Sequence, residues 1–319
     1  MAQASVCVII VSYRVRELLR QCLTSLRVPE NAVDIAEVIV VDNGSGDGTV
    51  EMIREQFPEV SLIENPANPG FGAANNLAIK AAGRDYILFL NPDTVVASGA
   101  PRRLREHLTE NTDTGVVGPR LRFPDGQTQS TRRRFPTILT ALLESTVAER
   151  WRPNSRTVRR YRMDDRGDDC VQDADWLVGA CLMTRKAVID EVGGFDERFF
   201  MYSEELDWCR RVRAAGWRVT YLPAAEVIHY EGKSSEQNLA RRAVIFNESK
   251  CRYFEKYYGR RVGLALRLYL LANTAYDLIV ELSKFCFGHK HQLRRARVAA
   301  LARVARAQTQ QLVARASGR

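Results

Sequence analysis

The stretch VIVVDNGSGDGT, residues 38–49, shows how the first half of the chain folds. An apolar, β-branched run ends at Asp42, and a turn rich in glycine, asparagine and aspartate follows it. Such a run bounded by turn residues is typical of a buried strand. The next segment, TVEMIREQF (49–57), has the apolar spacing of a helix, with Thr49 as a cap or first-turn residue. The stretch therefore predicts a strand, a tight turn and a helix.

The same alternation continues on both sides of this stretch. Residues 6–13, 60–65 and 85–91 are short apolar runs, whereas 14–26 and 70–82 have helical spacing. Strands that alternate with helices indicate an α/β fold, in which helices cover both faces of a mostly parallel sheet. Ligands of such sheets bind at the carboxyl ends of the strands. Polar residues follow the predicted strands at these positions: Ser12, Tyr13, Asp42, Asn43, Glu64, Asn65, Asn91 and Asp93.

The glycines of the turn, Gly44, Gly46 and Gly48, resemble a dinucleotide-binding loop only in part. Their spacing is G-x-G-x-G rather than G-x-G-x-x-G, and they follow the second predicted strand. In a dinucleotide fold the glycines follow the first strand and the acidic residue comes later. The motif therefore disfavours a dehydrogenase.

Composition places the chain among ordinary globular proteins. Its 319 residues allow one large domain with an appendage or two small domains, and 45% of them are hydrophobic and 27% charged. The seven cysteines are scattered without a C-x-x-C pair, which predicts reduced thiols rather than disulfides or structural zinc. The N-terminus lacks the pattern of a signal peptide, so we expect a cytoplasmic protein.

Six motifs occur in a characteristic order along the chain: VIIVSYRVRELLRQCLTSL (8–26), VIVVDNGSGDGT (38–49), NPGFGAANNLAI (68–79), YILFLNPDT (86–94), VGGFDERFFMYSEELDWCRRVRAAGW (192–217) and AEVIHYEGKSS (225–235). In this order they resemble the motifs of a family-two inverting glycosyltransferase with the GT-A fold. Within that family the chain most resembles the bacterial rhamnosyltransferases that build cell-surface polysaccharide. The motifs are specific as an ordered set, and they cover about residues 5–235.

The resemblance implies a division of the chain. Residues 1–238 are expected to form the GT-A catalytic domain, with a nucleotide-sugar half at about 1–97 and an acceptor half at about 98–238. Residues 239–319 are expected to form a helical, basic extension.

The resemblance also assigns the donor-binding residues. It implies that the carboxylate of Asp42 accepts a hydrogen bond from a pyrimidine ring N–H, and that the backbone around Val11 and Tyr13 lies against the same base. The alternative for Asp42 is that it caps its own turn, as aspartate commonly does.

Asn91, Pro92 and Asp93 form the family's version of an aspartate-x-aspartate metal motif. Asn91 stands in place of the first acid, so the resemblance implies that Asp93 is the direct carboxylate ligand and that Asn91 lies beside the nucleotide sugar. It places a second metal ligand at His229. Hard oxygen ligands suit Mn²⁺ or Mg²⁺, and a histidine tilts the choice toward Mn²⁺. The alternatives are an ordinary Asn-Pro turn and a structural histidine.

The acidic cluster in FMYSEELDWCRR, residues 200–211, poses a choice. Adjacent helical residues point about 100° apart, so Glu204 and Glu205 cannot both face one site. An inverting transfer needs one general base. Glu205 occupies the position where the family usually has its catalytic aspartate, which implies that Glu205 is the base and that Glu204 contacts the acceptor. Asp207 and Arg211 have the spacing of a helix-surface pair.

A different interpretation of this cluster is an acidic first helical turn, which the helix dipole favours. Nearby, the segment DWLVGACLM (175–183) is expected to form the floor of the acceptor site, with Gly179 and Ala180 allowing a sugar to approach closely. Its alternative is another buried strand. The basic segment 132–163 is expected to be a lid, an acceptor-binding insertion or a solvated loop.

The C-terminal region is apolar from Arg260 onward, but Arg267, Asp277 and Glu281 interrupt it. These charges disfavour a membrane-spanning helix and favour an amphipathic helix on the membrane surface. Residues 290–319 add eight Lys or Arg and no Asp or Glu, which suits an anionic surface. The alternative is a pair of helices packed on the catalytic domain or on a second copy in a homodimer.

These observations predict a metal-dependent inverting glycosyltransferase, peripheral on the inner face of the cell membrane. The favoured donor is dTDP-rhamnose, with a UDP- or GDP-sugar as the alternative, and the acceptor is a polyprenyl-diphosphate-linked or polysaccharide hydroxyl. A sugar-phosphate nucleotidyltransferase should carry a glycine-rich phosphate loop near the first strand, where VSYRVREL has no glycine. A nucleic-acid-binding protein is disfavoured because the basic tail lacks interleaved aromatic residues. A non-catalytic scaffold should have lost Asp93, Glu205 or His229, and the sequence retains all three.

Overall fold

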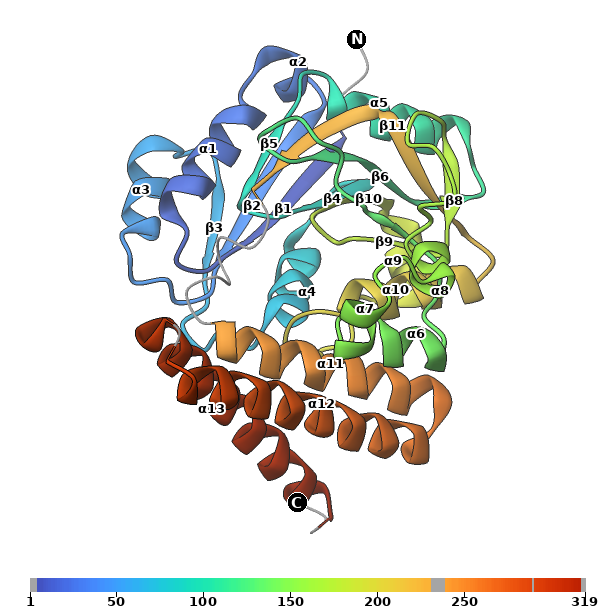
Figure 1. The fold of residues 1–319 in the computed structure, drawn as a ribbon. Helices are drawn as coiled ribbons and strands as arrows, with labels where there is room; N and C mark the ends of the chain where they lie inside the picture. Colours follow the sequence, from blue (N-terminus) through green and yellow to red (C-terminus); the bar gives the residue numbers. More distant parts are fainter. Residues whose placement is uncertain (1–4, 231–238, 289, 317–319) are drawn as a thin grey trace. The chain divides into compact units, whose positions relative to one another are not determined.

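The computed structural model describes residues 5–230, 239–288 and 290–316. Main-chain contacts divide the chain into two compact units (Figure 1). The first comprises Met1–Phe135, Arg162–Phe200 and Glu204–Ser234, and the second comprises Pro136–Tyr161, Met201–Ser203 and Ser235–Arg319. The boundary expected at residue 238 lies outside the described residues. The second unit also takes in residues 136–161, which the sequence assigned to the acceptor half.

A sheet forms the centre of the first unit. Over the described residues it has nine strands in the order β3-β2-β1-β4-β10-β6-β11-β5, with β8 paired to β11. The strands are β1 (Val6–Ser12), β2 (Ile35–Asp42), β3 (Ser61–Glu64), β4 (Tyr86–Leu90), β5 (Thr94–Val96), β6 (Thr114–Arg122), β8 (Gln172–Ala174), β10 (Cys181–Arg185) and β11 (Arg218–His229). Strands β1 to β4 pair in parallel, as predicted. Strand β10 is antiparallel to both neighbours, so the complete sheet is mixed.

Helices cover both faces of this sheet, as the alternation of strands and helices predicted. They are α1 (Arg16–Leu26), α2 (Pro29–Ala32), α3 (Thr49–Gln56), α4 (Phe71–Ala81), α5 (Ala100–Glu110), α9 (Lys186–Val192) and α10 (Glu204–Ala214). A separate ribbon pairs β7 (Arg132–Arg133) with β9 (Trp176–Leu177). The predicted segments 6–13, 14–26, 49–57, 60–65, 70–82 and 85–91, and the apolar run that ends at Asp42, all correspond to observed elements.

Strands β1 and β4 show that side chains pack against both faces of the sheet. Val6, Val8 and Ile10 are buried in one hydrophobic cluster with residues of α1, α3 and α5. On β4 the alternating residue Phe89 packs instead against Phe195 and Trp208, with ring centroids 5.0 and 5.7 Å apart. Successive strand residues point to opposite faces, so a strand buried on both sides must be apolar throughout. This explains the unbroken apolar runs in the sequence.

The glycines of the turn after β2 allow its backbone conformation. Gly44, Gly46 and Gly48 have φ angles of 73°, 61° and 84°. Only glycine adopts this left-handed region at little cost, so the turn requires glycine for its own shape.

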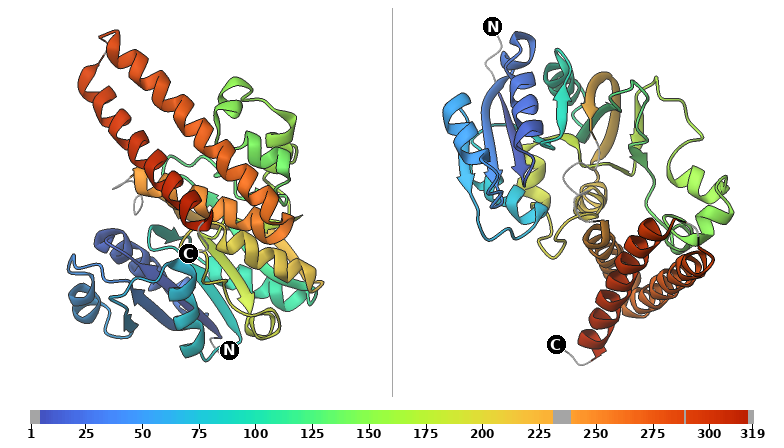
Figure 2. Two further views of the ribbon diagram at one scale, coloured as in Figure 1. Left: turned by 90° about the horizontal axis from the view of Figure 1, so that it is seen from below. Right: turned by 60° about the vertical axis from the view of Figure 1, so that its left-hand side comes forward.

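The second unit is helical. It contains α6 (Ile138–Leu143), α7 (Val147–Trp151), α8 (Arg156–Tyr161), α11 (Leu239–Tyr258), α12 (Arg260–Cys286) and α13 (His291–Ala316). Helices α12 and α13 run antiparallel and side by side (Figure 2). The basic segment 132–163 is therefore mostly helical rather than a loop. The side chains of Thr137 and Thr146 cap α6 and α7, a signal that the basic composition obscured.

Candidate active site

The sheet topology brings the candidate residues to one edge. Strands β1, β2 and β4 are parallel and end at Ser12, Asp42 and Leu90. Strand β10 runs the opposite way and begins at Cys181, which is paired with Leu90. Strand β6 is antiparallel to β10, and β11 is parallel to β6, so the carboxyl end of β11 reaches the same edge. The candidate residues that follow these strands therefore lie along one edge of the sheet, where ligands of such sheets bind.

Asp93 and His229 form a buried pair at this edge. His229, the last residue of β11, pairs with Thr94 at the start of β5, which brings Asp93 beside the ring. The Nε2 atom of His229 lies 3.4 Å from Oδ1 of Asp93, and the two residues are only 6% and 4% exposed. The structure thus brings together the two residues that the sequence singled out as metal ligands.

Gln129 fixes the orientation of the histidine ring. Its side-chain amide donates to the carbonyl oxygen of His229 at 2.7 Å, so its Oε1 is the atom that faces Nδ1 of His229, 2.9 Å away. Oε1 can only accept, which requires the proton on Nδ1. Nε2 is then the ring nitrogen on the side of Asp93. Sequence inspection missed Gln129, because it lies in none of the six motifs.

This arrangement fits a divalent cation that arrives with its substrate. Imidazole nitrogen and carboxylate oxygen are ordinary metal ligands, and a histidine whose second nitrogen is held by a buried amide is typical of metal sites. Among the described residues no group of three or more His, Cys, Asp or Glu could hold a metal ion. Two protein ligands suffice where substrate phosphates and water supply the others, as is common for Mg²⁺.

Asp42 lies where the sequence placed it, and its carboxylate bonds the turn. It is 3% exposed, Oδ2 accepts from the backbone N–H of Ser45 at 3.0 Å, and Oδ1 accepts from the Ser45 hydroxyl. Val11 is buried and Tyr13 half-buried at the end of the neighbouring strand, where the guanidinium of Arg14 lies over the Tyr13 ring. Asp42 therefore caps its turn in this structure. A carboxylate has about four acceptor sites, so it retains capacity for a further donor.

A backbone hydrogen bond between Asn91 and Ala180 links the end of β4 to the start of β10. The backbone N–H of Asn91 donates to the carbonyl oxygen of Ala180 at 2.9 Å. This bond continues the pairing of β4 with β10, in which Leu90 lies opposite Cys181. Residues 178–180 thus join β9 to β10 at the site edge, so the segment 175–183 contains both a bend and strands.

Gly179 makes room for Glu205. A Cβ atom on Gly179 would lie 3.2 Å from Cβ and 3.3 Å from Cγ of Glu205, so a side chain there would require Glu205 to shift. The structure therefore places Gly179 against the acidic pair at the start of α10.

Glu204 and Glu205 differ in their environments. Glu204 is buried and Glu205 half-buried. Burial, together with the neighbouring carboxylate of Glu205, raises the pKa of Glu204 well above its usual range. Oε2 of Glu204 has no hydrogen-bond partner among the described residues. Within the pair, this raised pKa favours the protonated form of Glu204.

Asp207 and Arg211 form an ion pair, but it is not on the helix surface. Asp207 is fully buried, and its Oδ2 accepts from Nε of Arg211 at 3.0 Å. The same guanidinium donates to the carbonyl oxygens of Val192 and Gly194, each at 2.6 Å. The expectation of a helix-surface pair was wrong in this respect, because Arg211 reaches back over α10 to hold the chain that leads into it.

The segment before α10 is hydrogen-bonded to helix α4 at two points. Asn76 of α4 accepts from the backbone N–H of Phe195 and donates to its carbonyl oxygen, both at 2.9 Å. The carbonyl oxygen of Phe200 accepts from the N–H of Phe71 at 2.7 Å. Tyr202 and Ser203 then adopt φ angles of 68° and 66°, which are costly for residues with a side chain. Strained backbone of this kind is concentrated at functional sites.

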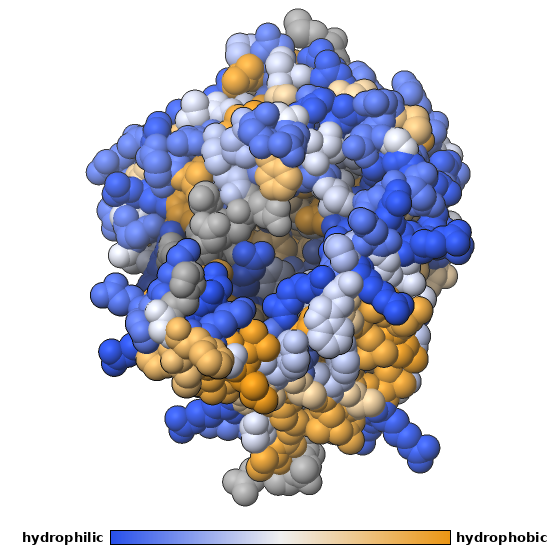
Figure 3. Space-filling model, viewed as in Figure 1, coloured by the Kyte–Doolittle hydropathy of each residue, from blue (hydrophilic) through white to orange (hydrophobic). Residues whose placement is uncertain are grey.

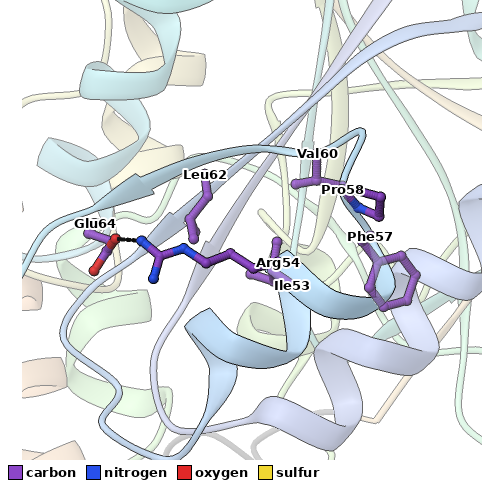
Figure 4. A pocket seen from close by; sticks show the side chains of 7 residues that line it. All are labelled: Ile53, Arg54, Phe57, Pro58, Val60, Leu62 and Glu64. Carbon is purple, nitrogen blue, oxygen red and sulfur yellow. Dashed lines mark hydrogen bonds and ion pairs between the residues drawn. The ribbon is translucent and has the colours of Figure 1, made fainter.

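A surface pocket of about 240 Å³ lies elsewhere in the first unit (Figure 4). It is lined by Ile53, Arg54, Phe57, Pro58, Val60, Leu62 and Glu64, none of which is a candidate site residue. Its two charged side chains, Arg54 and Glu64, form an ion pair with each other. The pocket therefore offers no uncompensated charge to a ligand.

Two curated proteins similar to this chain are rhamnosyltransferases. The chain is 31% identical over 223 residues to an N-acetylglucosaminyl-diphospho-decaprenol L-rhamnosyltransferase of Mycobacterium tuberculosis, covering 66% of this chain and 72% of that protein. It is 25% identical over 234 residues to the rhamnosyltransferase WbbL of Escherichia coli K12, covering 70% and 82%.

Solved structures show the same fold at lower identity. A mannosyltransferase from Pyrobaculum calidifontis, in complex with GDP-Man and Mn²⁺, superposes with a TM-score of 0.53 at 16% identity, covering 97% of this chain and 87% of that chain. GalNAc-T7 with UDP, GalNAc and Mn²⁺ superposes with a TM-score of 0.55 at 14% identity, covering 79% and 51%. The GT-A fold that the motifs implied is thereby confirmed.

The family is shown by a match over more than half of the chain. The sequence profile described as glycosyl transferase family 2 matches residues 7–193. This span includes the ends of β1, β2 and β4 and the start of β10, which form the candidate site edge. The chain therefore belongs to glycosyl transferase family 2, and it is a glycosyltransferase.

Proposed function

We propose that this glycosyltransferase moves L-rhamnose from dTDP-rhamnose to a hydroxyl of a polyprenyl-diphosphate-linked glycan. The names of the relatives in M. tuberculosis and E. coli support the sugar, and the decaprenol in the first name supports a lipid-linked acceptor. A UDP- or GDP-sugar donor is the alternative, supported by the ligands in the names of the structural neighbours.

The donor is proposed to bind at the ends of β1, β2 and β4. Asp42 would accept from the ring N–H of the base with its remaining acceptor capacity, while the backbone of Val11 and Tyr13 lies against the base. Asn91, directly after β4, would contact the diphosphate sugar. The nucleotide-sugar half at 1–97 and the acceptor half at 98–238 remain our proposed division of the catalytic domain.

Asp93 and His229 are proposed to hold Mn²⁺ or Mg²⁺. Bound there, the cation would neutralise the negative charge that develops on the departing diphosphate. Gln129 keeps Nδ1 of His229 protonated, so Nε2 stays available on the side of Asp93. The observation that carries the proposal is this oriented, buried pair on the same sheet edge as the acidic start of α10.

Glu205 is proposed to take the proton of the acceptor hydroxyl. Glu204 is proposed to contact the acceptor, because its raised pKa favours the protonated form, which can donate a hydrogen bond. Gly179 and Ala180 would lie beside the acceptor sugar, and Gly179 also leaves room for the Glu205 side chain. One base is sufficient, because an inverting transfer forms no covalent intermediate.

A donor panel tests the proposed function. dTDP-rhamnose, UDP-sugars and GDP-sugars would be assayed for release of nucleoside diphosphate with a polyprenyl-diphosphate-linked acceptor, with Mn²⁺ and after chelation. We expect dTDP-rhamnose to be preferred and release to stop on chelation. Release that continues without any divalent metal would contradict the roles of Asp93 and His229.

Replacing Gln129 tests the metal site separately from turnover. We expect Gln129→Leu to weaken Mn²⁺ binding about 10- to 100-fold, because the ring loses its orienting partner. The measurement is free Mn²⁺ by electron paramagnetic resonance in the presence of nucleoside diphosphate. Gln127→Leu is the matched control, since Gln127 is exposed on the same loop. Equal Mn²⁺ affinity in the two variants would refute the orienting role.

A further inference from the structure

Helix α12 turns its charged residues toward the other helices of its unit. Arg267 is buried, and its guanidinium donates to Glu248 of α11 at 3.0 Å. Glu281 accepts from Arg294 of α13 at 2.6 Å, and Asp277 is ion-paired with an arginine of α7. The charges that interrupt this apolar sequence are therefore compensated inside the helical unit.

The opposite face of α12 is apolar and exposed. Each of its residues has another three or four positions away, as on a single helix face. We call them the apolar stripe: Leu264, Leu268, Ala272, Ala275, Tyr276, Ile279, Leu282 and Cys286. Leu268 is 52% and Ile279 66% exposed. Figure 3 shows hydrophobic residues gathered over helices of this unit. From Leu264 to Ser283, all of which the structure describes, no exposed residue of α12 is charged.

Basic residues lie at both ends of the apolar stripe. Arg260 and Arg261 are exposed at the start of α12, and Lys290 is exposed after its end. Helix α13 adds exposed Arg295, Arg303 and Arg306, and the sequence has no Asp or Glu after Glu281. Trp151 of α7, 70% exposed, packs edge-to-face on Tyr276 with ring centroids 5.7 Å apart. Exposed tryptophan and tyrosine beside an apolar face are typical of membrane interfaces.

We propose that the apolar stripe lies in the surface of an anionic lipid bilayer, with α12 parallel to the membrane plane. By length and composition, α12 is the one helix among the described residues that could cross a membrane. Crossing would carry Arg267, Asp277 and Glu281 into hydrocarbon, whereas lying in the interface keeps their ion pairs intact. The arginines and lysines beside the stripe would face anionic headgroups. This inference is independent of the identity of the donor sugar.

Charge disfavours a second copy of this chain as the partner of the stripe. Because α12 is flanked by basic residues at both ends, parallel and antiparallel pairing would each bring positive charges together. Juxtaposed like charges oppose association. An anionic lipid surface compensates both ends at once.

The experiment is sedimentation of the full-length protein with phosphatidylcholine vesicles, with and without phosphatidylglycerol. We expect the wild type to bind the anionic vesicles and Leu268→Glu/Ile279→Glu to bind them on the order of a hundredfold more weakly, since charge replaces inserted apolar side chains. The matched control is Val33→Glu/Val171→Glu, at residues 49% and 51% exposed in the first unit. Circular dichroism and thermal unfolding would verify that both variants fold.

The basic residues have their own test. Arg260→Gln/Arg261→Gln should weaken binding to anionic vesicles about fivefold for each charge removed and leave binding to phosphatidylcholine unchanged. The proposal is overturned if phosphatidylglycerol does not increase wild-type binding, or if the folded Leu268→Glu/Ile279→Glu variant binds like the wild type. Analytical ultracentrifugation tests a second copy as the partner. The proposal is also overturned if the wild type is a dimer and the Leu268→Glu/Ile279→Glu variant is a monomer that still binds vesicles.

Discussion

The start of helix α10 holds two kinds of acid within one turn. Asp207 is fully buried and bonded to Arg211, which also ties down Val192 and Gly194. Glu204 is buried as well, but its charged neighbour is another carboxylate, Glu205, and its pKa is raised accordingly. The first arrangement compensates a charge and stabilises the fold. The second places two carboxyl groups side by side at the start of a helix, and the backbone before it is strained.

Asp207→Ala should have the largest effect on stability. It leaves the guanidinium of Arg211 without its buried carboxylate, which we expect to lower the free energy of unfolding by about 3–5 kcal/mol. Urea denaturation measures this. The control is Asp190→Ala, which breaks the exposed pair of Asp190 with Lys186 and should cost about 0–1 kcal/mol. Equal losses in the two variants would show that Asp207 is not a structural anchor.

Gly179→Ala should displace the side chain of Glu205. The added Cβ would lie 3.2 Å from Cβ of Glu205, so we expect that side chain to move and kcat to fall about 10- to 100-fold. Gly167→Ala is the matched control, because nothing lies within 4 Å of a Cβ at that position. Unchanged kcat in Gly179→Ala would mean that the position of Glu205 does not limit the reaction.

Ser203→Gly should relieve the strain that precedes the acidic pair. With φ at 66°, the backbone of Ser203 suits glycine, and we expect the free energy of unfolding to rise by about 1 kcal/mol. Ser130→Gly, at an exposed residue outside the left-handed set, should instead lower it slightly. A loss of stability in Ser203→Gly would indicate that its side chain matters more than its backbone.

The smallest expected effect is a change in the pH dependence of stability. Because the folded-state pKa of Glu204 is raised, its stabilising contribution is complete below about pH 4.5 and is lost as pH rises through the folded value. Glu204→Gln removes this loss. Its Tm relative to the wild type should therefore be higher at neutral pH than at pH 4.5. A constant difference in Tm across this range would argue against a protonated Glu204.

Local pattern explains which parts of the fold could be predicted. Buried parallel strands are continuous apolar runs, so residues 6–12 and 35–42 were visible in the sequence, and so was the edge at Asp42. The antiparallel direction of β10 depends on distant pairing with Leu90, which no local pattern encodes. The capped helices α6 and α7 were hidden by basic composition.

Candidate site residues could be proposed from the sequence only where motifs exist. Asp93 and His229 stand in motifs, and the structure places them 3.4 Å apart. Gln129 contacts His229 from one hundred residues away, so only the folded chain reveals it. The burial of Asp207 likewise depends on the carbonyl groups that surround Arg211. Spacing alone indicated the pair but not its environment.

The most direct test of the central claim compares Glu205→Gln with Glu204→Gln at the proposed site. Sugar transfer to the acceptor would be assayed in both variants and the wild type. Donor affinity would be measured separately in each by calorimetry. The account predicts that Glu205→Gln loses about 10²- to 10⁴-fold in kcat with donor affinity unchanged, because the general base is removed. It predicts a smaller loss for Glu204→Gln, which retains a neutral side chain able to donate to the acceptor. An inactive Glu204→Gln beside an active Glu205→Gln would contradict it.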